Sequence, residues 1–385
     1  MTSPYFLQRL VLIFSVLIAP AAWSAVPPPP QLAAKSWVLI DAASGSVLVD
    51  HQGATRLPPA SLTKLMTSHV AAMELQRGKV KESDLVTISE KAWRMGGSKM
   101  FVKVGDQITV KDLLRGIIVQ SGNDASIALA EHLAGGEDTF AAMMNQEAKR
   151  LGLADTRFVN ATGWPAEGHY SSALDMARLA RAIVIEDPEH YALYAEKEFV
   201  WNGIKQPNRN LLLWRDPTVD GLKTGHTEEA GYCLVASSKR DGQRLIAAVF
   251  GTDSETARAT ETAKLLVYGF NFFDSKTFFK QGETVQSVAV WKGAARSLKA
   301  GVASDFAAAL PKRTSGEVQT RIVLAEGEVV APVAAGAPLG RIELVGGDGK
   351  VVMQAPLVAL EAVEEGGFFR RMWDGIRLFF KGLFG

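Results

Sequence analysis

The segment Pro59-Ala60-Ser61-Leu62-Thr63-Lys64 places a serine and a lysine three residues apart, and no other Ser-x-x-Lys occurs among the 385 residues. A helical pattern runs from Ala60 to about Gln76. On a helix, a spacing of three puts both side chains on one face, about 5–6 Å apart at Cβ. The prolines before Ser61 predict that it lies in the first helical turn, where free N–H groups and the positive end of the helix dipole stabilise negative charge.

Two further short segments follow this one, Ser121-Gly122-Asn123 and then Lys223-Thr224-Gly225. Taken alone, Ser-x-x-Lys arises by chance about once in a chain of this length, and Ser-Gly-Asn is a common turn or helix cap. Together, widely separated and in this order, the three segments form the signature of serine acyl-transferases that react with penicillin. The order matters because three different elements must fold onto one cleft.

Each segment contributes a chemical group that acyl transfer requires. A serine hydroxyl is a poor nucleophile unless an adjacent base takes its proton. Lys64 is a base only when neutral, a state that burial and a second nearby cation favour, and we expect Lys223 to be that cation. For the first segment alone, an ordinary helix with an exposed lysine is the alternative. Ser121, at an expected break between two helices, is a plausible proton shuttle to the leaving amine, and Asn123 can hydrogen-bond the substrate's amide backbone.

The third segment is expected to begin a strand. Lys223 and Thr224 present a cation and a hydroxyl to a carboxylate. Gly225 removes a side chain where another backbone must approach closely.

The three segments and their flanking residue pairs resemble those of the low-molecular-mass penicillin-binding proteins, specifically the D-alanyl-D-alanine carboxypeptidases of the penicillin-binding protein 5 and 6 type (peptidase S11). The flanking residue pairs are Pro59-Ala60, Asp220-Gly221 and His226-Thr227. The resemblance covers nearly the whole chain. It implies an oxyanion hole formed by the N–H groups of Ser61 and His226. It also implies that Arg258 helps hold the substrate's terminal carboxylate, with a salt bridge on a helix surface as the alternative.

The resemblance implies a serine-type carboxypeptidase that removes the terminal D-alanine from peptidoglycan stem pentapeptides through an acyl-enzyme on Ser61. Its expected partners are stem peptides ending in D-Ala-D-Ala and β-lactam antibiotics, and no cofactor is expected. A D,D-endopeptidase acting on cross-links would use the same residues. A penicillin-acylated sensor and a catalytically inactive wall-binding module are alternatives of another class. The presence of Ser61, Lys64 and Lys223 argues against a catalytically inactive protein.

A class A-like β-lactamase is a further alternative. That class places a glutamate in the loop equivalent to residues 151–172 and an asparagine four positions later. Here Glu167 is followed by Gly168-His169-Tyr170-Ser171, so the pattern for deacylation is absent.

The first 25 residues read as a secretory signal peptide, because Arg9 is their only charged side chain and an apolar run precedes several small residues. An uncleaved anchor is the alternative. Without this segment the chain has 41 basic and 41 acidic residues, a balance that argues against nucleic acid as a partner. The six histidines show no ligand spacing, so no metal is expected. The single Cys233 is interpreted as a small buried hydrophobe.

The fold class expected is an α/β penicillin-recognising domain with an antiparallel sheet and helices (residues 32–274), followed by a small β-sandwich (275–365). Asp241-Gly242 and Asp348-Gly349 are hairpin turns between strand-like runs. The sandwich region contains no cluster of catalytic residue types, so a spacer or docking role is expected.

The tail, residues 366–385, predicts an amphipathic helix from Phe368 to Phe384. Its aromatic-rich apolar residues fall within one arc, and most of its basic residues lie opposite. Such a helix lies in a membrane interface, and charge interrupts it too often for it to span a bilayer. We therefore expect a periplasmic enzyme attached peripherally to the outer face of the inner membrane of a Gram-negative bacterium. A helix packed on the protein's own surface is the alternative.

Overall fold

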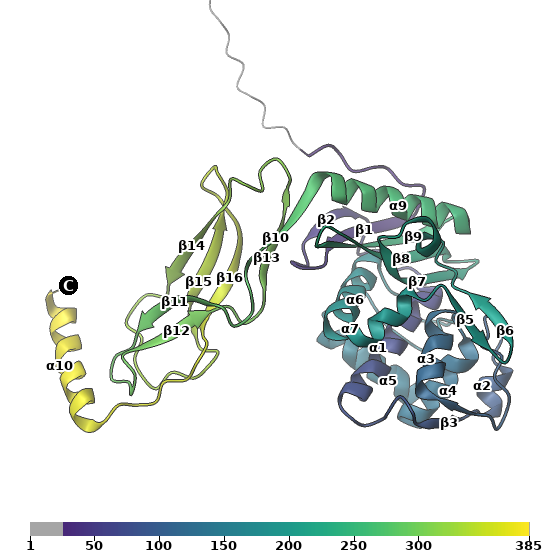
Figure 1. Cartoon of the computed structure of the whole chain (residues 1–385), viewed down its shortest axis with the longest axis horizontal. Helices are drawn as coiled ribbons and strands as arrows, with labels where there is room; N and C mark the ends of the chain where they lie inside the picture. Colours follow the sequence, from purple (N-terminus) through teal and green to yellow (C-terminus); the bar gives the residue numbers. More distant parts are fainter. Residues whose placement is uncertain (1–25, 385) are drawn as a thin grey trace, which may run out of the picture.

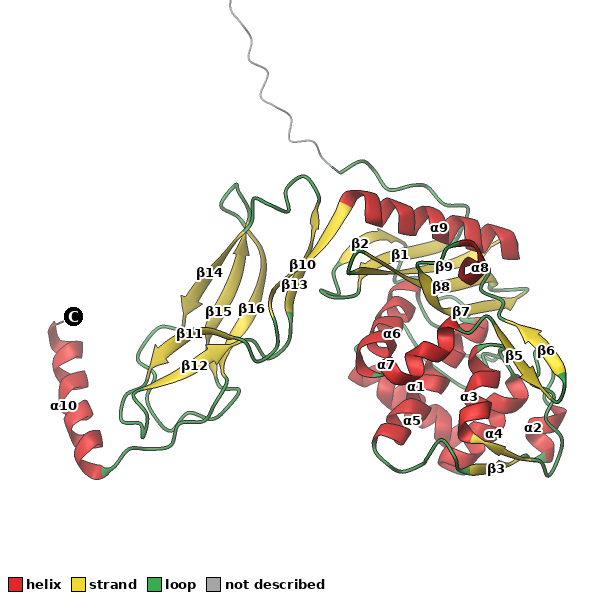
Figure 2. Ribbon diagram, viewed as in Figure 1, coloured by secondary structure: helices red, strands yellow, loops and turns green. Residues whose placement is uncertain are grey.

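The computed structural model describes residues 26–384, so the predicted signal peptide lies outside the described residues. Two domains and a terminal helix, α10 (Phe368–Phe384), follow one another along the long axis of the molecule (Figure 1). The N-terminal domain combines helices with a sheet, and the C-terminal domain is built from strands (Figure 2). No helix in the described part of the chain is long and apolar enough to cross a membrane. The limits predicted for the domains stay predictions.

A five-stranded antiparallel sheet in the order β2-β1-β9-β8-β7 is the framework of the N-terminal domain. The hairpin predicted at Asp241-Gly242 is present, since β8 pairs with β9, and β1 and β2 form a second antiparallel pair. Asp241 and Gly242 connect β8 to β9 with φ values of 48° and 86°, the left-handed conformations that tight hairpin turns require. The strands are β1 (Ser36–Asp41), β2 (Val47–His51), β7 (Val219–Thr227), β8 (Gly231–Arg240) and β9 (Gln243–Thr252).

Helices cover both faces of this sheet, with α9 (Glu255–Phe272) on one face and α1 and α6 on the other. Successive side chains of a strand point to opposite faces, so a central strand in such a sandwich is apolar throughout. Strand β9 follows this rule, because alternate residues belong to two different core clusters. Leu245, Ala247 and Val249 pack with α9, and Ile246, Ala248 and Phe250 face the helical side.

The other helices and the short strands complete the N-terminal domain. Ser and Thr side chains cap several helices; Thr109, for example, accepts from Asp112 N at 3.1 Å. The helices are α1 (Thr63–Gln76), α2 (Glu90–Arg94), α3 (Val110–Ile118), α4 (Asn123–Ala134), α5 (Glu137–Arg150), α6 (Ala173–Glu186), α7 (Pro188–Tyr191) and α8 (Leu212–Arg215), with 3-10 turns η1 (Ala60–Leu62) and η2 (Ala192–Ala195). The short strands are β3 (Leu85–Thr87), β4 (Gln107–Thr109), β5 (Glu198–Trp201) and β6 (Ile204–Pro207).

The C-terminal domain encloses its own apolar core between a five-stranded sheet, in the order β11-β12-β16-β15-β14, and the two-stranded ribbon β10-β13. The core includes Leu298, Phe306 and Ile342, each at most 2% exposed. The hairpin turn predicted at Asp348-Gly349 connects β15 and β16, which pair with each other. The strands are β10 (Phe273–Phe279), β11 (Thr284–Ala289), β12 (Ser297–Gly301), β13 (Phe306–Pro311), β14 (Gln319–Leu324), β15 (Pro338–Val345) and β16 (Val351–Ala359).

Candidate active site

Ser61 and Lys64 lie at the junction between the 3-10 turn η1 and helix α1, beneath strand β7. The prediction that Ser61 occupies the first turn of an α-helix is wrong in detail, because the α-helix begins only at Thr63. Ala60 has φ 47°, a left-handed conformation that a continuous right-handed helix excludes. The tighter turn still keeps the two side chains together: Lys64 Nζ is 3.1 Å from Ser61 Oγ.

The Lys64 side chain is only 1% exposed, and protein atoms surround its nitrogen. Nζ donates to Asn123 Oδ1 at 2.7 Å and to the Thr162 carbonyl at 2.5 Å. A neutral amine has two N–H groups and one lone pair. With both N–H groups held by these acceptors, the lone pair is left for the Ser61 hydroxyl.

The electrostatics of the cleft favour that neutral amine. Burial first, and then the nearby Arg209 guanidinium, lower the pKa of Lys64 from 10.5 to about 7, although Asp124 opposes the change. The expected repulsion between Lys64 and Lys223 appears in the pKa of Lys223, and the effect of Lys223 on the pKa of Lys64 stays a prediction. Burial drives the pKa of Lys223 itself well below 10.5, with Lys64, Arg209 and Arg258 adding to the shift.

Ser121 lies between α3 and α4, as the predicted helix break required. Its φ of 67° is unusual for a residue with a side chain, and such strain is found at functional sites. Its Oγ is buried and has no hydrogen-bond partner in the structure. Asn123 begins α4 and donates through Nδ2 to Gly96 O at 2.8 Å, so its Oδ1 is turned to Lys64.

Lys223, Thr224 and Gly225 lie in the middle of β7 and not at its start, because the strand already begins at Val219. The predicted role of Gly225 is confirmed: a Cβ there would lie 2.9 Å from the Pro59 carbonyl oxygen. The absence of a side chain thus lets β7 lie directly against the chain that carries Ser61.

These groups open onto one cleft of about 710 Å³. All the predicted site residues except the two buried lysines appear among its lining residues. His226 stacks on Tyr232 with ring centroids 3.9 Å apart, and Arg258 lies over the same ring. The lining includes Ser61, Ser121, Asn123, Thr162, Trp164, Arg209, Thr224, Gly225, His226, Tyr232, Glu255 and Arg258.

Two arginines, Arg209 and Arg258, line the cleft together with the glutamates Glu228, Glu229 and Glu255. Arg258 is 2% exposed and donates to the Arg209 carbonyl at 3.3 Å, so it belongs to the cleft, although its Nη2 also lies 3.4 Å from Glu255. Sequence analysis missed Arg209. It stands in a loop, outside any motif, and is brought to the cleft by its neighbour Asn210, which donates to Gly221 O at 3.0 Å. No local signal distinguishes it from other loop arginines.

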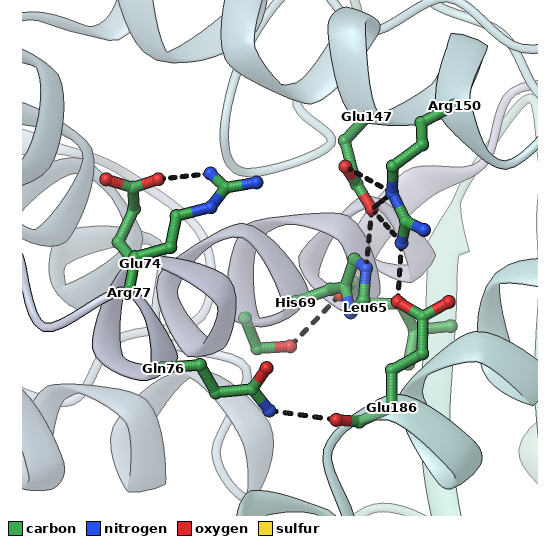
Figure 3. Close-up of polar contacts among 9 residues, drawn as sticks. Leu65, His69, Glu74, Gln76, Arg77, Glu147, Arg150 and Glu186 are labelled. Carbon is green, nitrogen blue, oxygen red and sulfur yellow. Dashed lines mark hydrogen bonds and ion pairs between the residues drawn. The ribbon is translucent and has the colours of Figure 1, made fainter. Parts of the chain in front are cut away.

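Helix α1 is also fixed at the side away from the cleft (Figure 3). His69 Nε2 lies 2.9 Å from a Glu147 oxygen, and Arg150 bonds both Glu147 and Glu186. Burial opposes ionisation of Glu147, but the bonds from His69 and Arg150 hold its pKa at about 2. His69, Glu147 and Glu186 place three potential metal-ligand atoms within 4.8 Å of one another. Since Arg150 already binds both carboxylates, we interpret the cluster as a structural tie between α1, α5 and α6.

Penicillin-recognising serine enzymes bring a Ser-x-x-Lys turn, a Ser-x-Asn turn and a Lys-Thr-Gly strand together in one cleft, and both this arrangement and the α/β fold are present here. Residues 23–254 match the model of the peptidase S11 D-alanyl-D-alanine carboxypeptidase family, and residues 273–365 match that of the penicillin-binding protein 5 C-terminal domain. The chain belongs to this carboxypeptidase family.

Individual relatives agree with this assignment. The chain is 42% identical to D-alanyl-D-alanine carboxypeptidase DacC of Escherichia coli (strain K12) over 97% of its own length and 95% of that protein. The structure of penicillin-binding protein 5 from Haemophilus influenzae aligns with a TM-score of 0.82 and 41% identity, covering 88% of this chain and 99% of that one. Penicillin-binding protein D2 from Listeria monocytogenes, in an ampicillin-bound form, aligns with a TM-score of 0.58 and 28% identity, covering 63% of this chain and 100% of that one.

Proposed function

We propose that this chain is a D,D-carboxypeptidase that removes the terminal D-alanine from peptidoglycan stem peptides. Ser61 Oγ attacks the penultimate D-alanine carbonyl, the terminal D-alanine leaves as the free amino acid, and water hydrolyses the ester on Ser61. The observation that carries the proposal is the placement of a buried, low-pKa Lys64 amine 3.1 Å from Ser61 Oγ.

In the proposed proton path, Lys64 and Ser121 each accept one proton and give up one. Neutral Lys64 takes the Ser61 proton as the C–O bond forms. Ser121, whose hydroxyl has no other partner, delivers a proton to the leaving nitrogen and is reprotonated from Lys64. The N–H groups of Ser61 and His226 are the proposed donors to the developing oxyanion.

Cations on one wall of the cleft support recognition of a free carboxylate. Arg209 and Arg258 line that wall beside Thr224, with Lys223 behind it. A carboxylate bound there gains charge-assisted hydrogen bonds. A substrate that ends in a free carboxylate, as a stem peptide does, matches this charge.

The observations favour a peptidase over a β-lactamase. Glu167 is exposed and is not among the residues that line the cleft, so it does not fix a water for deacylation. We propose that β-lactams acylate Ser61 and that the penicilloyl-enzyme persists much longer than the peptidyl acyl-enzyme. Rapid steady-state turnover of benzylpenicillin would contradict this.

Mass spectrometry of purified muropeptides before and after incubation tests the assignment. Loss of one alanine from monomeric pentapeptides supports the carboxypeptidase, and opening of cross-linked dimers without that loss supports the endopeptidase. Labelling by a fluorescent penicillin with neither product would make the chain a sensor. Ser61→Ala protein is the control for contaminating hydrolases.

We further propose that α10 (Phe368–Phe384) attaches the enzyme to the outer face of the inner membrane. Its polar side is bound to the C-terminal domain, because Asp374 accepts from Lys292 N at 2.8 Å and Lys381 pairs with Glu328. This leaves a continuous apolar side exposed to solvent. Its exposed members are Phe368, Phe369, Met372, Trp373, Ile376, Phe379, Phe380 and Leu383.

The expected strength is several kcal/mol, since each buried apolar side chain contributes about 1.5–3 kcal/mol, while immersion is partial and ordering costs free energy. Co-sedimentation with anionic phospholipid vesicles measures it. Asp at Phe369, Trp373 and Phe380 should release the protein, whereas Asp at Leu378, on the flank, should matter less. Equal partitioning of all variants into the soluble fraction would make α10 an ordinary packed helix.

A further inference from the structure

His169 lies in the loop of residues 151–172, buried against the beginning of α1 and outside the three motifs. Its Nε2 is 2.8 Å from the Thr63 hydroxyl, and its Nδ1 accepts from Val159 N at 3.0 Å. The Phe158 ring packs against it edge-on, with centroids 6.0 Å apart. The imidazole therefore joins two chain segments that are about a hundred positions apart in sequence.

These contacts define the protonation state of the ring. Val159 N–H donates to Nδ1, so Nδ1 carries no proton and the neutral ring holds its proton on Nε2. That proton is donated to Thr63 Oγ1. Burial first, and then the nearby Lys64, lower the pKa of His169 to about 4, so the ring is neutral at the pH where Lys64 becomes a free amine.

Both segments joined by His169 hold the reacting groups. Thr63 lies between Ser61 and Lys64, and Val159 is three residues before Thr162, whose carbonyl accepts from Lys64 Nζ at 2.5 Å. A shift of the loop relative to α1 would move this acceptor away from the amine. The loop fits closely here, since a Cβ on Gly163 would overlap the Ala60 carbonyl oxygen.

We propose that His169 is a positioning residue for acylation: its neutral imidazole clamps the loop of residues 151–172 to the start of α1 and so holds the Thr162 carbonyl on the Lys64 amine. The inference rests on the proposed acylation of Ser61 by way of Lys64. His169 itself touches neither substrate nor the reacting atoms. It sets the geometry in which Lys64 has one lone pair directed at Ser61.

Substitutions that keep one of the two contacts test the clamp. His169→Gln retains a donor near Nε2, His169→Asn retains an acceptor near Nδ1, and His169→Ala retains neither. A misplacement of about 1 Å costs on the order of 100-fold in rate. We expect His169→Ala to lower kcat for a soluble D-Ala-D-Ala peptide about 10- to 100-fold, with KM changed less than about threefold, and His169→Gln and His169→Asn to recover part of the loss.

Thr63→Val removes the hydroxyl partner and closes a double-mutant cycle. In the wild-type background it should slow acylation by a fluorescent penicillin about tenfold or more, and in the His169→Ala background less than about twofold. His190→Gln is the matched control, because His190 is also buried, but its hydrogen bond is to Asp187 and not to the start of α1 or the loop of residues 151–172. It should leave kcat unchanged. If His169→Ala does not fold, the Gln and Asn variants carry the same comparison.

Nitrogen-15 NMR of the full-length protein gives a readout independent of activity. The His169 signals should report a protonated Nε2 and an unprotonated Nδ1 from pH 6 to 8 and should move in Thr63→Val protein. The inference is overturned if folded His169 variants acylate at the wild-type rate. It is also overturned if the losses in acylation rate caused by Thr63→Val and His169→Ala simply add, or if the His169 ring has its proton on Nδ1. The proposed function fails separately, if wild-type protein takes up no label.

Discussion

The N-terminal domain buries two lysines without a carboxylate partner, whereas the buried carboxylate of the C-terminal domain, Glu343, has two arginine partners. Lys64 and Lys223 are 1% and 3% exposed, and none of the ion pairs among the described residues includes either of them. In the C-terminal domain, the Glu343 carboxylate lies between Arg321 and Arg341, at 2.6 and 2.7 Å. Burying an unpaired charge is costly, and the group responds by giving up its proton. The difference teaches that in this chain a buried lysine without a carboxylate partner marks the place where chemistry occurs.

The largest effect is expected from Ser61→Ala, which should lower peptide hydrolysis by more than about 10⁴-fold and abolish labelling by fluorescent penicillin. The reason is that no other serine in the chain has a lysine three positions on. The matched control in the C-terminal domain is Ser287→Ala on an exposed position of β11, which should label normally. If the Ser61→Ala protein is still labelled by the fluorescent penicillin, the nucleophile is another residue and the comparison between the two domains fails.

Lys64→Arg should lower acylation by about 10²- to 10⁴-fold, the contribution typical of a general base. Arginine keeps the charge and the helix propensity but does not deprotonate in a protein. Stopped-flow acylation with a fluorescent penicillin measures the rate, and circular dichroism checks the fold. Lys299→Arg, on β12 of the C-terminal domain, should have no effect on the rate. If folded Lys64→Arg protein is acylated at nearly the wild-type rate, Lys64 is not the general base.

Sequence analysis identified these two residues because their motif is local. A spacing of three is sufficient to bring Ser61 and Lys64 together whether the turn is α-helical, as predicted, or 3-10, as observed. The cations that tune the site are different. Lys223 was recognised from its motif, and the expected repulsion between Lys64 and Lys223 contributes to the lowered pKa of Lys223. Arg209, which lowers the pKa of Lys64, belongs to no motif.

Arg209 and His169 show what a single sequence does not reveal. The partner of His169 is 106 positions away, and Arg209 reaches the cleft only through the packing of a loop against β7. Neither residue belongs to a periodic pattern, so hydrophobic periodicity and turn signals give no information about them. The fold class, in contrast, follows from hairpin turns and apolar runs that are continuous in sequence, and it was predicted correctly.

Lys223→Ala and Arg258→Ala should each weaken kcat/KM about 10- to 100-fold for a peptide with a free terminal carboxylate. A hydrogen bond between a charged group and a desolvated carboxylate is worth on the order of 1.5–3 kcal/mol. The loss should be smaller for the C-terminally amidated analogue. Steady-state kinetics with the two peptides decides the point, since equal losses on both would mean that these cations tune Lys64 and do not bind substrate.

Arg209→Ala should move the acid limb of the acylation rate toward higher pH. Lys64 acts as a base only when neutral, so the rate rises with pH through its pKa of about 7. Removing a neighbouring positive charge makes the ammonium form more favourable, which raises that pKa and lowers the rate at pH 7 severalfold. A pH profile of penicillin labelling from pH 5 to 9 measures the displacement. If the acid limb of the pH profile stays in place or moves to lower pH, Arg209 does not act on Lys64 through its charge.

The smallest effect on catalysis is expected from deleting residues 366–385. The hydrogen bonds and ion pairs of α10 in this structure reach C-terminal-domain residues such as Lys292, Ala294 and Glu328, far from the cleft. kcat/KM for a soluble peptide should therefore agree within about twofold between the full-length and truncated enzymes. For the same peptide anchored in anionic vesicles, the full-length enzyme should be faster, because binding at one surface raises the effective concentration of enzyme and substrate. If the full-length and truncated enzymes hydrolyse the anchored peptide at equal rates, α10 does not attach the enzyme to the membrane. A large loss of kcat/KM on the soluble peptide would instead show that α10 and the C-terminal domain influence the active site. The comparison between a catalytic domain and a separate non-catalytic domain would then fail.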